Sequence, residues 1–424
     1  MTASQFLPLG YPAGLESGGL ESGGLESFDL RDPGLIADPV PIYTRLRAMG
    51  PVHYLPRHDL WMVTRYQEAV TVLREPEVFS SKLGMSFDLA RPGTVNAGVD
   101  YRFGGPDVRV LVATDPPEHQ VFRRAVAGMF TRASAEAASQ RVAQRARTCV
   151  QDLLEHATRG TADFYTQVAA PLPVLVLADL FGMPEDMHDR FRAWATLMTA
   201  DLDNEPAPAA VGRGLDMFRY FSKQLKHPPQ IGRRTVFDSI MSARDAHVTD
   251  RELLAFCAFL LVAGIETTTN LLTNLLAALI AFPDAYRQLR ASPELLPAAV
   301  EEGLRYETPL QMLWRGTTQP AELGGHHIPA GARVMVAFGS ANRDEREFIT
   351  PDIFRLDRDP NLHLGFGAGP HYCLGARLAR LEITTVMREL LAATTDIEIA
   401  SPPARTKSIV LRGFTKLPVR VRPA

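Results

Sequence analysis

The stretch that decides the fold is His363-Leu-Gly-Phe-Gly-Ala-Gly-Pro-His-Tyr-Cys-Leu-Gly-Ala-Arg377, in the last quarter of a 424-residue chain. Three glycines, each separated from the next by one residue, permit a tight and partly left-handed backbone path: Gly365, Gly367 and Gly369. The pattern from Leu374 to Leu391 predicts a helix, so Cys373 should lie at or just before a helix N-terminus. Unpaired backbone N–H groups and the positive end of the helix dipole stabilise a thiolate there. The stretch therefore predicts a thiolate held by a glycine-rich loop.

Cysteine usage limits the alternatives. The chain has three cysteines and no CxxC pair, which excludes the common zinc and iron–sulfur spacings, and no CxxCH for covalent c-type haem attachment. An odd and sparse count suits a reducing cytoplasm. A lone cysteine is ordinarily a small buried hydrophobe, and that is the prediction for Cys149 and Cys257. For Cys373 the surrounding glycines and the following helix favour a functional thiolate over a core cysteine.

Composition indicates an ordinary soluble globular protein with neither a nucleic-acid nor a membrane partner. Forty-five basic residues are balanced by 48 acidic ones, without long runs of either sign. The N-terminus lacks the pattern of a signal peptide. The longest apolar run, Leu253 to Ile265, has 13 residues, whereas a bilayer crossing requires about 20. We therefore expect a cytoplasmic protein.

The chain divides into a short tail and one large domain. Residues Gly14 to Ser27 repeat Gly-Leu-Glu-Ser, a composition that buries too little apolar surface to fold by itself. Residues 1–27 are thus predicted to be a disordered tail, and residues 28–424 a single domain. Strands are predicted around a turn within Val52–Thr64 and again over Ala332–Phe338, while most other segments have helical patterns, such as Ser134–Ala157.

A long helix with polar residues at its centre is the second chemical signal. Thr249 and Glu252 have the spacing of a capping box, and no proline follows until Pro283, so the helix should run about 33 residues, or ~50 Å. Near its middle lie a glycine and three threonines, within Ala263–Asn270. Glycine costs a helix interior about 1 kcal/mol, and threonine hydroxyls can bond back to carbonyls. A kink without chemistry would explain these residues, and so would a functional site.

Taken together, these segments resemble the cytochrome P-450 superfamily. Phe366-Gly-Ala-Gly-Pro-His-Tyr-Cys-Leu-Gly375 is similar to the haem-binding signature of that family. Four other segments match its motifs in the expected order: Ala263–Thr267, Glu302–Arg305, Pro351–Phe354 with Arg358, and Asp115–His119 with Arg123. The resemblance implies a mainly α fold with small β-sheets, a triangular helical prism. It also implies that haem lies between the long central helix and the helix after Cys373.

The resemblance assigns roles to the residues around the cofactor, heme b. Cys373 would be the axial ligand of the iron, and its thiolate would favour O–O cleavage. Phe366 would shield the sulfur, and Gly375 would let a flat macrocycle approach the first helical turn. The haem propionates would be bound by four cationic or polar side chains: His119, Arg123, Arg315 and His371. Further contacts to the cofactor are expected from Gly367, Ala263 and Gly264.

The remaining motifs imply a brace and a route for protons. Glu302 and Arg305, three apart on a helix, would form a buried triad with Arg358 that supports the cysteine loop. Glu266 and Thr267 would deliver protons to bound dioxygen. Many relatives carry Asp where this chain has Glu266, so the path of the proton can differ.

We expect a monooxygenase that hydroxylates or oxidatively dealkylates a small, largely apolar substrate, with resemblance to bacterial members acting on small aromatic compounds. Substrate-facing residues would be Leu310, Leu313, Phe87 and Phe103, the last two in a loop from Met85 to Arg109 that also holds Tyr101. The match uses nearly the whole chain, so electrons should come from a separate ferredoxin and its NAD(P)H-dependent reductase. Candidates for docking that partner are Arg124, Arg377 and Arg380.

A monomer is expected. Two alternatives stay open: a peroxide-driven haem oxidase, and a haem-thiolate sensor or binding protein without catalysis. The Glu266 and Thr267 pair argues against the first. The second should carry a signalling or DNA-binding module, and none is visible in the sequence.

Overall fold

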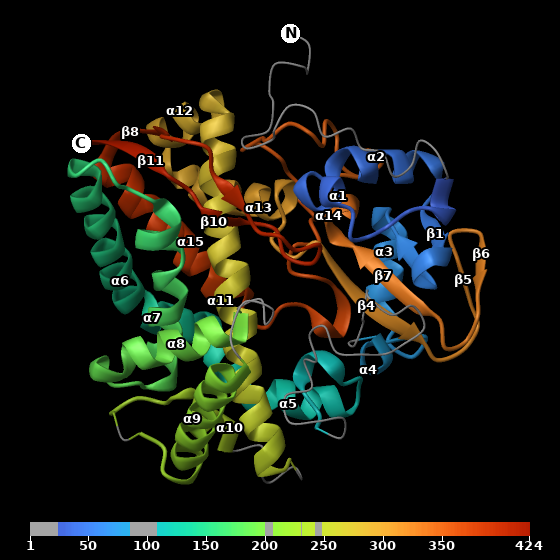
Figure 1. The fold of residues 1–424 in the computed structure, drawn as a ribbon, viewed down its shortest axis with the longest axis horizontal. Coiled ribbons are helices and arrows are strands. Elements are labelled where there is room, and N and C mark those ends of the chain that lie inside the picture. The colour runs from blue at the N-terminus through green and yellow to red at the C-terminus, as the bar shows by residue number, and fades with distance from the viewer. Residues whose placement is uncertain (1–23, 85–107, 200–206, 230, 242–247) are drawn as a thin grey trace.

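The computed structural model describes residues 24–84, 108–199, 207–229, 231–241 and 248–424. Helices dominate these residues (Figure 1). Their bounds are α1 Pro33–Ala37, α2 Val40–Met49, α3 Tyr66–Arg74, α4 Ser81–Gly84, α5 Glu118–Ala127, α6 Arg132–Thr158, α7 Pro171–Phe181, α8 His188–Thr199, α9 Ala207–Lys226, α10 Val236–Met241, α11 Asp250–Ala281, α12 Pro283–Ala291, α13 Leu296–Tyr306, α14 Phe338–Ala341 and α15 Ala376–Ala393. A mainly α fold with small sheets is therefore confirmed.

The central helix α11 begins and ends where the sequence predicts. The Thr249 hydroxyl accepts a hydrogen bond from the backbone N–H of Glu252, and the Glu252 carboxylate accepts one from the backbone N–H of Thr249. Pro283 opens the next helix. By length and composition α11 could cross a membrane, but 61% of its most apolar window is buried inside the molecule. Its apolar character thus reflects a core helix packed on most sides.

Helices cover one side of α11 in Figure 1, where α6, α7 and α15 form the largest core cluster with it. The predicted helix over Ser134–Ala157 is confirmed as α6. Helix α7 lies close to α11 at Gly264, where an added Cβ would be 2.9 Å from Cδ1 of Leu177. Gly264 therefore lets these two helices approach closely.

The five-stranded sheet lies on the other side of α11 in Figure 1 and has the order β1-β2-β7-β4-β3. The strands are β1 Val52–Leu55, β2 Leu60–Val63, β3 Phe79–Ser80, β4 Met312–Thr317 and β7 Arg333–Ala337. β1 pairs with β2 as a hairpin, while β2 runs parallel to β7. Both strand predictions are confirmed. Three two-stranded sheets complete the fold: β5 Ala321–Leu323 with β6 His326–Ile328, β8 Thr394–Ile399 with β11 Val419–Pro423, and β9 Ala404–Arg405 with β10 Phe414–Lys416.

The beginning of the described chain packs against the sheet. Phe28 and Leu30 are buried in a cluster with the inner residues of β2 and β7. Gly24–Glu26 form a short 3-10 helix, and Leu25 packs against the same cluster. Ordered packing thus begins a few residues before position 28. The rest of the repeat lies outside the described residues.

Candidate functional site

The loop before α15 has the backbone that its glycines predict. Gly367 and Gly369 have φ of +70° and +67°. A Cβ on Gly369 would be 2.3 Å from the carbonyl oxygen of Leu73, so only glycine fits against α3. The loop closes with the backbone N–H of Cys373 donating to the carbonyl of Phe366 at 2.9 Å. The sulfur is thus placed just before the first turn of α15.

Opposing effects act on the Cys373 thiol. Burial raises its pKa, while the backbone N–H groups of Gly375 and Ala376 and the charges of Arg123 and Arg380 lower it. The net effect is a raised pKa, because desolvation outweighs the helix terminus. The helix N-terminus thus acts in the predicted direction, but burial outweighs it in the free thiol. A metal cation bound to the sulfur would favour the thiolate further.

Three basic side chains gather beside this loop: His119 and Arg315 are buried, His371 is partly buried, and the charge of Asp115 acts on the first two. The imidazole rings of His119 and His371 lie 4.3 Å apart, and neither ring nitrogen of His119 has a hydrogen-bond partner. The Arg315 guanidinium is 3% exposed and donates only to the carbonyl of Trp314. Burial lowers the pKa of Arg315 to about 10, of His119 to about 4 and of His371 to about 2. Carboxylate groups of a ligand placed here would supply hydrogen-bond acceptors for these three side chains.

Arg123 reaches the cysteine loop from α5. Its Nη2 donates to the carbonyl oxygen of Tyr372 at 2.8 Å, next to the ligand residue. His371 in turn bonds the Ser81 hydroxyl at 3.1 Å. The four residues predicted to bind propionates thus come from α5, β4 and the cysteine loop.

The residues present fit a haem group. The unpaired nitrogens of His119 are buried donors and acceptors that call for a polar ligand. A Cβ on Gly375 would meet no atom within 4 Å, so the space beside the first turn of α15 is clear for a flat group. Cys373 would provide one soft ligand to the iron at that turn. This combination matches a macrocycle with an iron centre and two carboxylates.

The middle of α11 has exposed surface where most of its length is buried. Ala263 is exposed, and Gly264, Glu266 and Thr267 are partly exposed. The Thr267 hydroxyl donates to the carbonyl of Ala263 at 3.0 Å. Burial raises the pKa of Glu266 to about 7, so its carboxyl group can both hold and release a proton near neutral pH.

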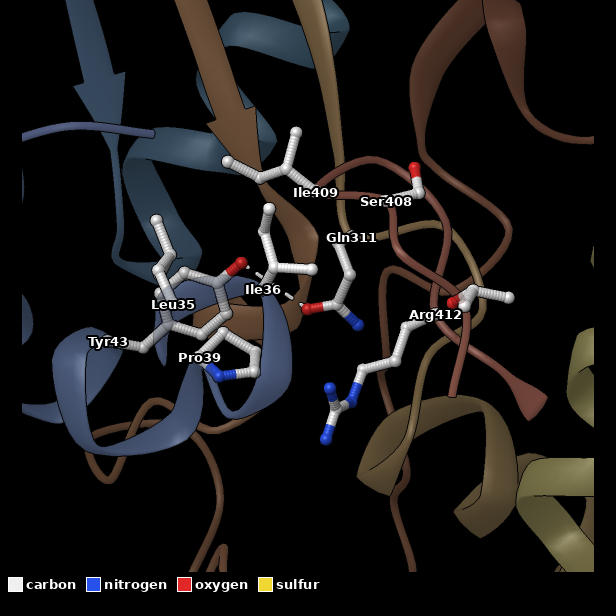
Figure 2. Close-up of a pocket in the computed structure, with 9 residues that line it drawn as sticks. Leu35, Ile36, Pro39, Tyr43, Gln311, Ser408, Ile409 and Arg412 are labelled. Carbon is white, nitrogen blue, oxygen red and sulfur yellow. Dashed lines mark hydrogen bonds between the residues drawn. The ribbon is translucent and has the colours of Figure 1, made fainter. Parts of the chain in front are cut away.

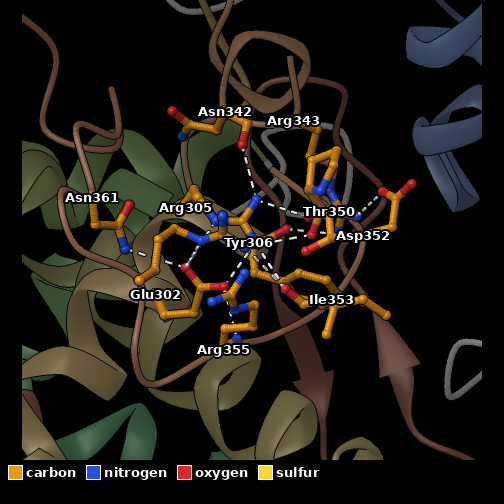
Figure 3. Close-up of polar contacts among 12 residues, drawn as sticks. Glu302, Arg305, Tyr306, Asn342, Arg343, Thr350, Asp352, Ile353, Arg355 and Asn361 are labelled. Atoms are coloured by element: carbon orange, nitrogen blue, oxygen red, sulfur yellow. Dashed lines mark hydrogen bonds and ion pairs between the residues drawn. The ribbon is translucent and has the colours of Figure 1, made fainter. Parts of the chain in front are cut away.

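The predicted brace is present and is larger than predicted (Figure 3). Glu302 accepts two hydrogen bonds of 2.8 Å from Arg305 and one of 3.0 Å from Arg358. This carboxylate has two further donors that were not predicted, the amide of Asn361 and the backbone N–H of Arg355. No spacing rule connects them to Glu302, because they approach from a loop more than 50 residues away in the chain.

The predicted substrate residues have mixed outcomes. Leu310 and Leu313 are partly buried, and Leu310 forms a β-bridge with Leu411. Phe87 and Phe103, like Tyr101, lie outside the described residues. Figure 2 shows a small pocket that includes Gln311, the residue after Leu310, but none of the predicted site residues. Its lining residues are Leu35, Ile36, Pro39, Tyr43, Gln311, Thr406, Ser408, Ile409 and Arg412.

The three arginines expected to dock an electron donor differ in their surroundings. Arg124 and Arg377 are exposed. Arg380 instead forms internal bonds, with Glu301 and with the hydroxyl of Tyr372. Its guanidinium is therefore already used within the protein, which weakens its candidacy for docking.

Comparisons with known proteins agree with this geometry. A family profile described as Cytochrome P450 matches residues 215–393. The beta-dihydromenaquinone-9 omega-hydroxylase of Mycobacterium tuberculosis is 34% identical over 403 residues, which is 93% of this chain and 78% of the hydroxylase. Cytochrome P450 monooxygenase PikC of Streptomyces venezuelae is 34% identical over 396 residues, 91% of this chain and 92% of PikC.

Solved structures show the same fold. Cytochrome P450 CYP109Q5 from Chondromyces apiculatus superposes with a TM-score of 0.82 at 31% identity, covering 94% of this chain and 98% of that protein. The cofactor of the family is heme b, which the residues around Cys373 fit, and its members are oxygen-inserting oxidoreductases. The chain belongs to the cytochrome P450 family and is a haem-thiolate monooxygenase.

Proposed function

We propose that this protein hydroxylates, or oxidatively dealkylates, a small and largely apolar organic substrate in the bacterial cytoplasm. It acts as a monomer and takes electrons from a separate ferredoxin and an NAD(P)H-dependent ferredoxin reductase. The partly buried apolar side chains of Leu310 and Leu313 support an apolar guest. The M. tuberculosis relative is, by its name, an omega-hydroxylase of beta-dihydromenaquinone-9.

The observation that carries the proposal is the Glu266 carboxyl at the centre of α11. Insertion of one oxygen atom of O2 into a C–H bond reduces the other atom to water, which takes up two electrons and two protons. Haem with a thiolate ligand supplies the oxygen activation when bound. Glu266 is partly exposed, has a pKa of about 7, and can pass protons from solvent. Thr267 beside it can position the water and oxygen that receive them.

The absorption spectrum of the reduced protein under carbon monoxide tests the ligand assignment. We expect a strongly red-shifted Soret band, which Cys373→Ser abolishes. A globin-like band in the unaltered protein would contradict thiolate ligation.

The substrate class can be tested with a compound library and the low-spin to high-spin shift of the ferric Soret band. Apolar compounds of small size should give the shift, while polar compounds of the same size serve as controls. Turnover of a hit with ferredoxin, reductase and NAD(P)H should form hydroxylated or dealkylated product. Product formed with peroxide alone, at an equal rate and without those partners, would favour the peroxide-driven alternative.

A further inference from the structure

A second ionic cluster lies next to the Glu302 brace and contacts the cysteine loop directly. We define it as the Glu301 cluster, made of Glu301, His363, Phe366, Tyr372 and Arg380. Glu301 is the residue before Glu302 on α13, and its carboxylate accepts two hydrogen bonds of 2.6 Å from Nε and Nη2 of Arg380. This fork-to-fork geometry fixes the plane of the guanidinium as well as its position.

Arg380 is held over the aromatic ring of Phe366, a residue hydrogen-bonded to Cys373 through the backbone. Its guanidinium carbon lies 4.5 Å from the centroid of the Phe366 ring, within the range of a cation–π contact. Phe366 is also the residue whose carbonyl accepts the Cys373 backbone N–H. The remaining Arg380 nitrogen, Nη1, donates to the hydroxyl of Tyr372 at 3.3 Å. One cation therefore contacts two residues of the loop that holds the sulfur.

Glu301 also fixes the beginning of the same loop. The backbone N–H of Gly365 donates to Nδ1 of His363 at 3.1 Å, so Nε2 carries the proton and donates to Glu301 at 3.1 Å. His363 is only 4% exposed, so this bond is shielded from solvent. One carboxylate on α13 thus fixes His363 directly and Tyr372 through Arg380.

The charges of the cluster are stable across the accessible pH range. Hydrogen bonds from Arg380 and His363, together with the charge of Arg380, hold the pKa of Glu301 at about 2 despite burial, and the pKa of Arg380 is raised. The Arg380 charge is close enough to lower the pKa of the Cys373 thiol. An anionic sulfur at this point therefore experiences a cation whose charge is balanced by Glu301.

We propose that Glu301 is a positioning residue that holds Arg380 over Phe366, and that this ion pair sets the reduction potential of the haem iron bound to Cys373. The inference rests on the thiolate ligation proposed above. Reduction of the iron adds one negative charge beside the sulfur, so a neighbouring cation favours the reduced state and a neighbouring anion opposes it. Removal of one partner leaves the other unbalanced. The two single substitutions should therefore shift the potential in opposite directions.

The experiment is a spectroelectrochemical titration of the haem-loaded protein. Glu301→Gln leaves Arg380 unbalanced and should shift the midpoint potential to more positive values. Arg380→Gln leaves Glu301 unbalanced and should shift it to more negative values. The double variant should return close to the unaltered protein. Shifts of the same sign in both single variants, or no shift in either, would show that the cluster only braces the loop and would overturn the proposal.

Matched variants separate charge from general loss of structure. Asp179 on α7 accepts two hydrogen bonds from Arg145 on α6, and this ion pair is also partly buried. Asp179→Asn removes the charge of that carboxylate and should leave the potential unchanged. If Glu301→Gln does not fold with haem, the potentials of Arg380→Lys and Arg380→Gln are compared instead. Lysine keeps the charge and should keep the potential near its original value; a lysine variant that shifts as far as the glutamine variant contradicts the charge effect. The carbon monoxide band of the unaltered protein tests thiolate ligation independently. A failure of that ligation can therefore be distinguished from a failure of the proposed charge effect on the potential.

Discussion

At the scale of single residues, the carboxylates of a bound haem would satisfy the buried His119 and Arg315. Among the described residues neither ring nitrogen of His119 has a hydrogen-bond partner, and Arg315 donates to the carbonyl of Trp314. Glu382 on α15 is different. It is 3% exposed, its Oε2 has no hydrogen-bond partner, and burial raises its pKa to about 8.

The Glu382 carboxyl should make stability depend on pH. An ordinary glutamate in the unfolded chain has a pKa near 4.5, so the folded protein binds an extra proton between about pH 4.5 and 8. Stability therefore falls as the pH rises through that window, and is constant above it. Glu382→Gln should remove this loss and stabilise the protein at pH 8.5 by roughly 1–3 kcal/mol, with little change at pH 5. Denaturant titrations at the two pH values measure the difference, and equal effects at both would contradict the pKa.

Thr267 should affect the fate of electrons more than binding. Without its hydroxyl, protons and water near bound dioxygen are less well positioned, so reducing equivalents should leave as peroxide. We expect Thr267→Ala to keep the carbon monoxide band and to raise the ratio of peroxide to hydroxylated product about 100-fold or more, the lower end of the typical contribution of one proton-transfer group. Parallel assays of NAD(P)H, peroxide and product check this. Thr273→Ala on the same helix, where the hydroxyl bonds backbone carbonyls, is the control, and unchanged coupling in Thr267→Ala would refute its role.

At the scale of elements, helix α13 presents two adjacent glutamates to two different networks. Glu302 faces the buried arginines 305 and 358, while Glu301 faces the cysteine loop. Gly303 on the same helix lets α11 approach, because an added Cβ would be 3.0 Å from Leu275. The helix thus connects the central helix, the arginine brace and the ligand loop.

The Glu302 brace should contribute strongly to stability. Glu302 and Arg305 are fully buried, so Glu302→Gln leaves two guanidinium groups without a counter-charge. Loss of one partner of a buried pair costs about 3–5 kcal/mol, which we expect in the free energy of unfolding, together with reduced haem retention. Asp284→Asn breaks an exposed pair with Arg287 at the same spacing and should change stability by less than about 0.5 kcal/mol. A similar small effect for both would mean that the brace is not a stabilising element.

At the scale of the whole molecule, the N-terminal segment closes the sheet side of the fold. Phe28 is 1% exposed and Leu30 is fully buried, and the backbone N–H of Leu30 donates to Nε2 of His58 at 3.0 Å. These contacts begin immediately after the Gly-Leu-Glu-Ser repeat. The domain therefore depends on the residues that follow the repeat.

Truncation should separate the tail from the domain. Removal of residues 1–23 should leave the melting temperature and the carbon monoxide band unchanged. Removal of residues 1–30 also deletes Phe28 and Leu30, whose burial is worth about 1.5–3 kcal/mol each, so we expect a loss of roughly 3–6 kcal/mol. Calorimetry of both variants measures this. Equal melting temperatures after the two deletions would contradict the importance of these contacts.

The sequence by itself determined the features that depend on local pattern. Capping at Thr249, the helix after Cys373 and the strands around residues 52–63 depend on neighbouring residues, and each was predicted close to its observed bounds. The assignment of Cys373 as the expected ligand rests on a continuous motif. Glu302 and Arg305 share one helical turn, so their pairing could also be predicted from spacing.

Only the tertiary structure decided which distant groups meet and how burial changes them. It placed Asn361 on Glu302, Glu301 on Arg380 and Leu177 against Gly264, because contacts across loops and between helices leave no regular spacing in the chain. It also decided the protonation of the site. The N–H groups at the helix terminus lower the pKa of the Cys373 thiol, whereas burial, which depends on the packing of the whole molecule, raises it by more.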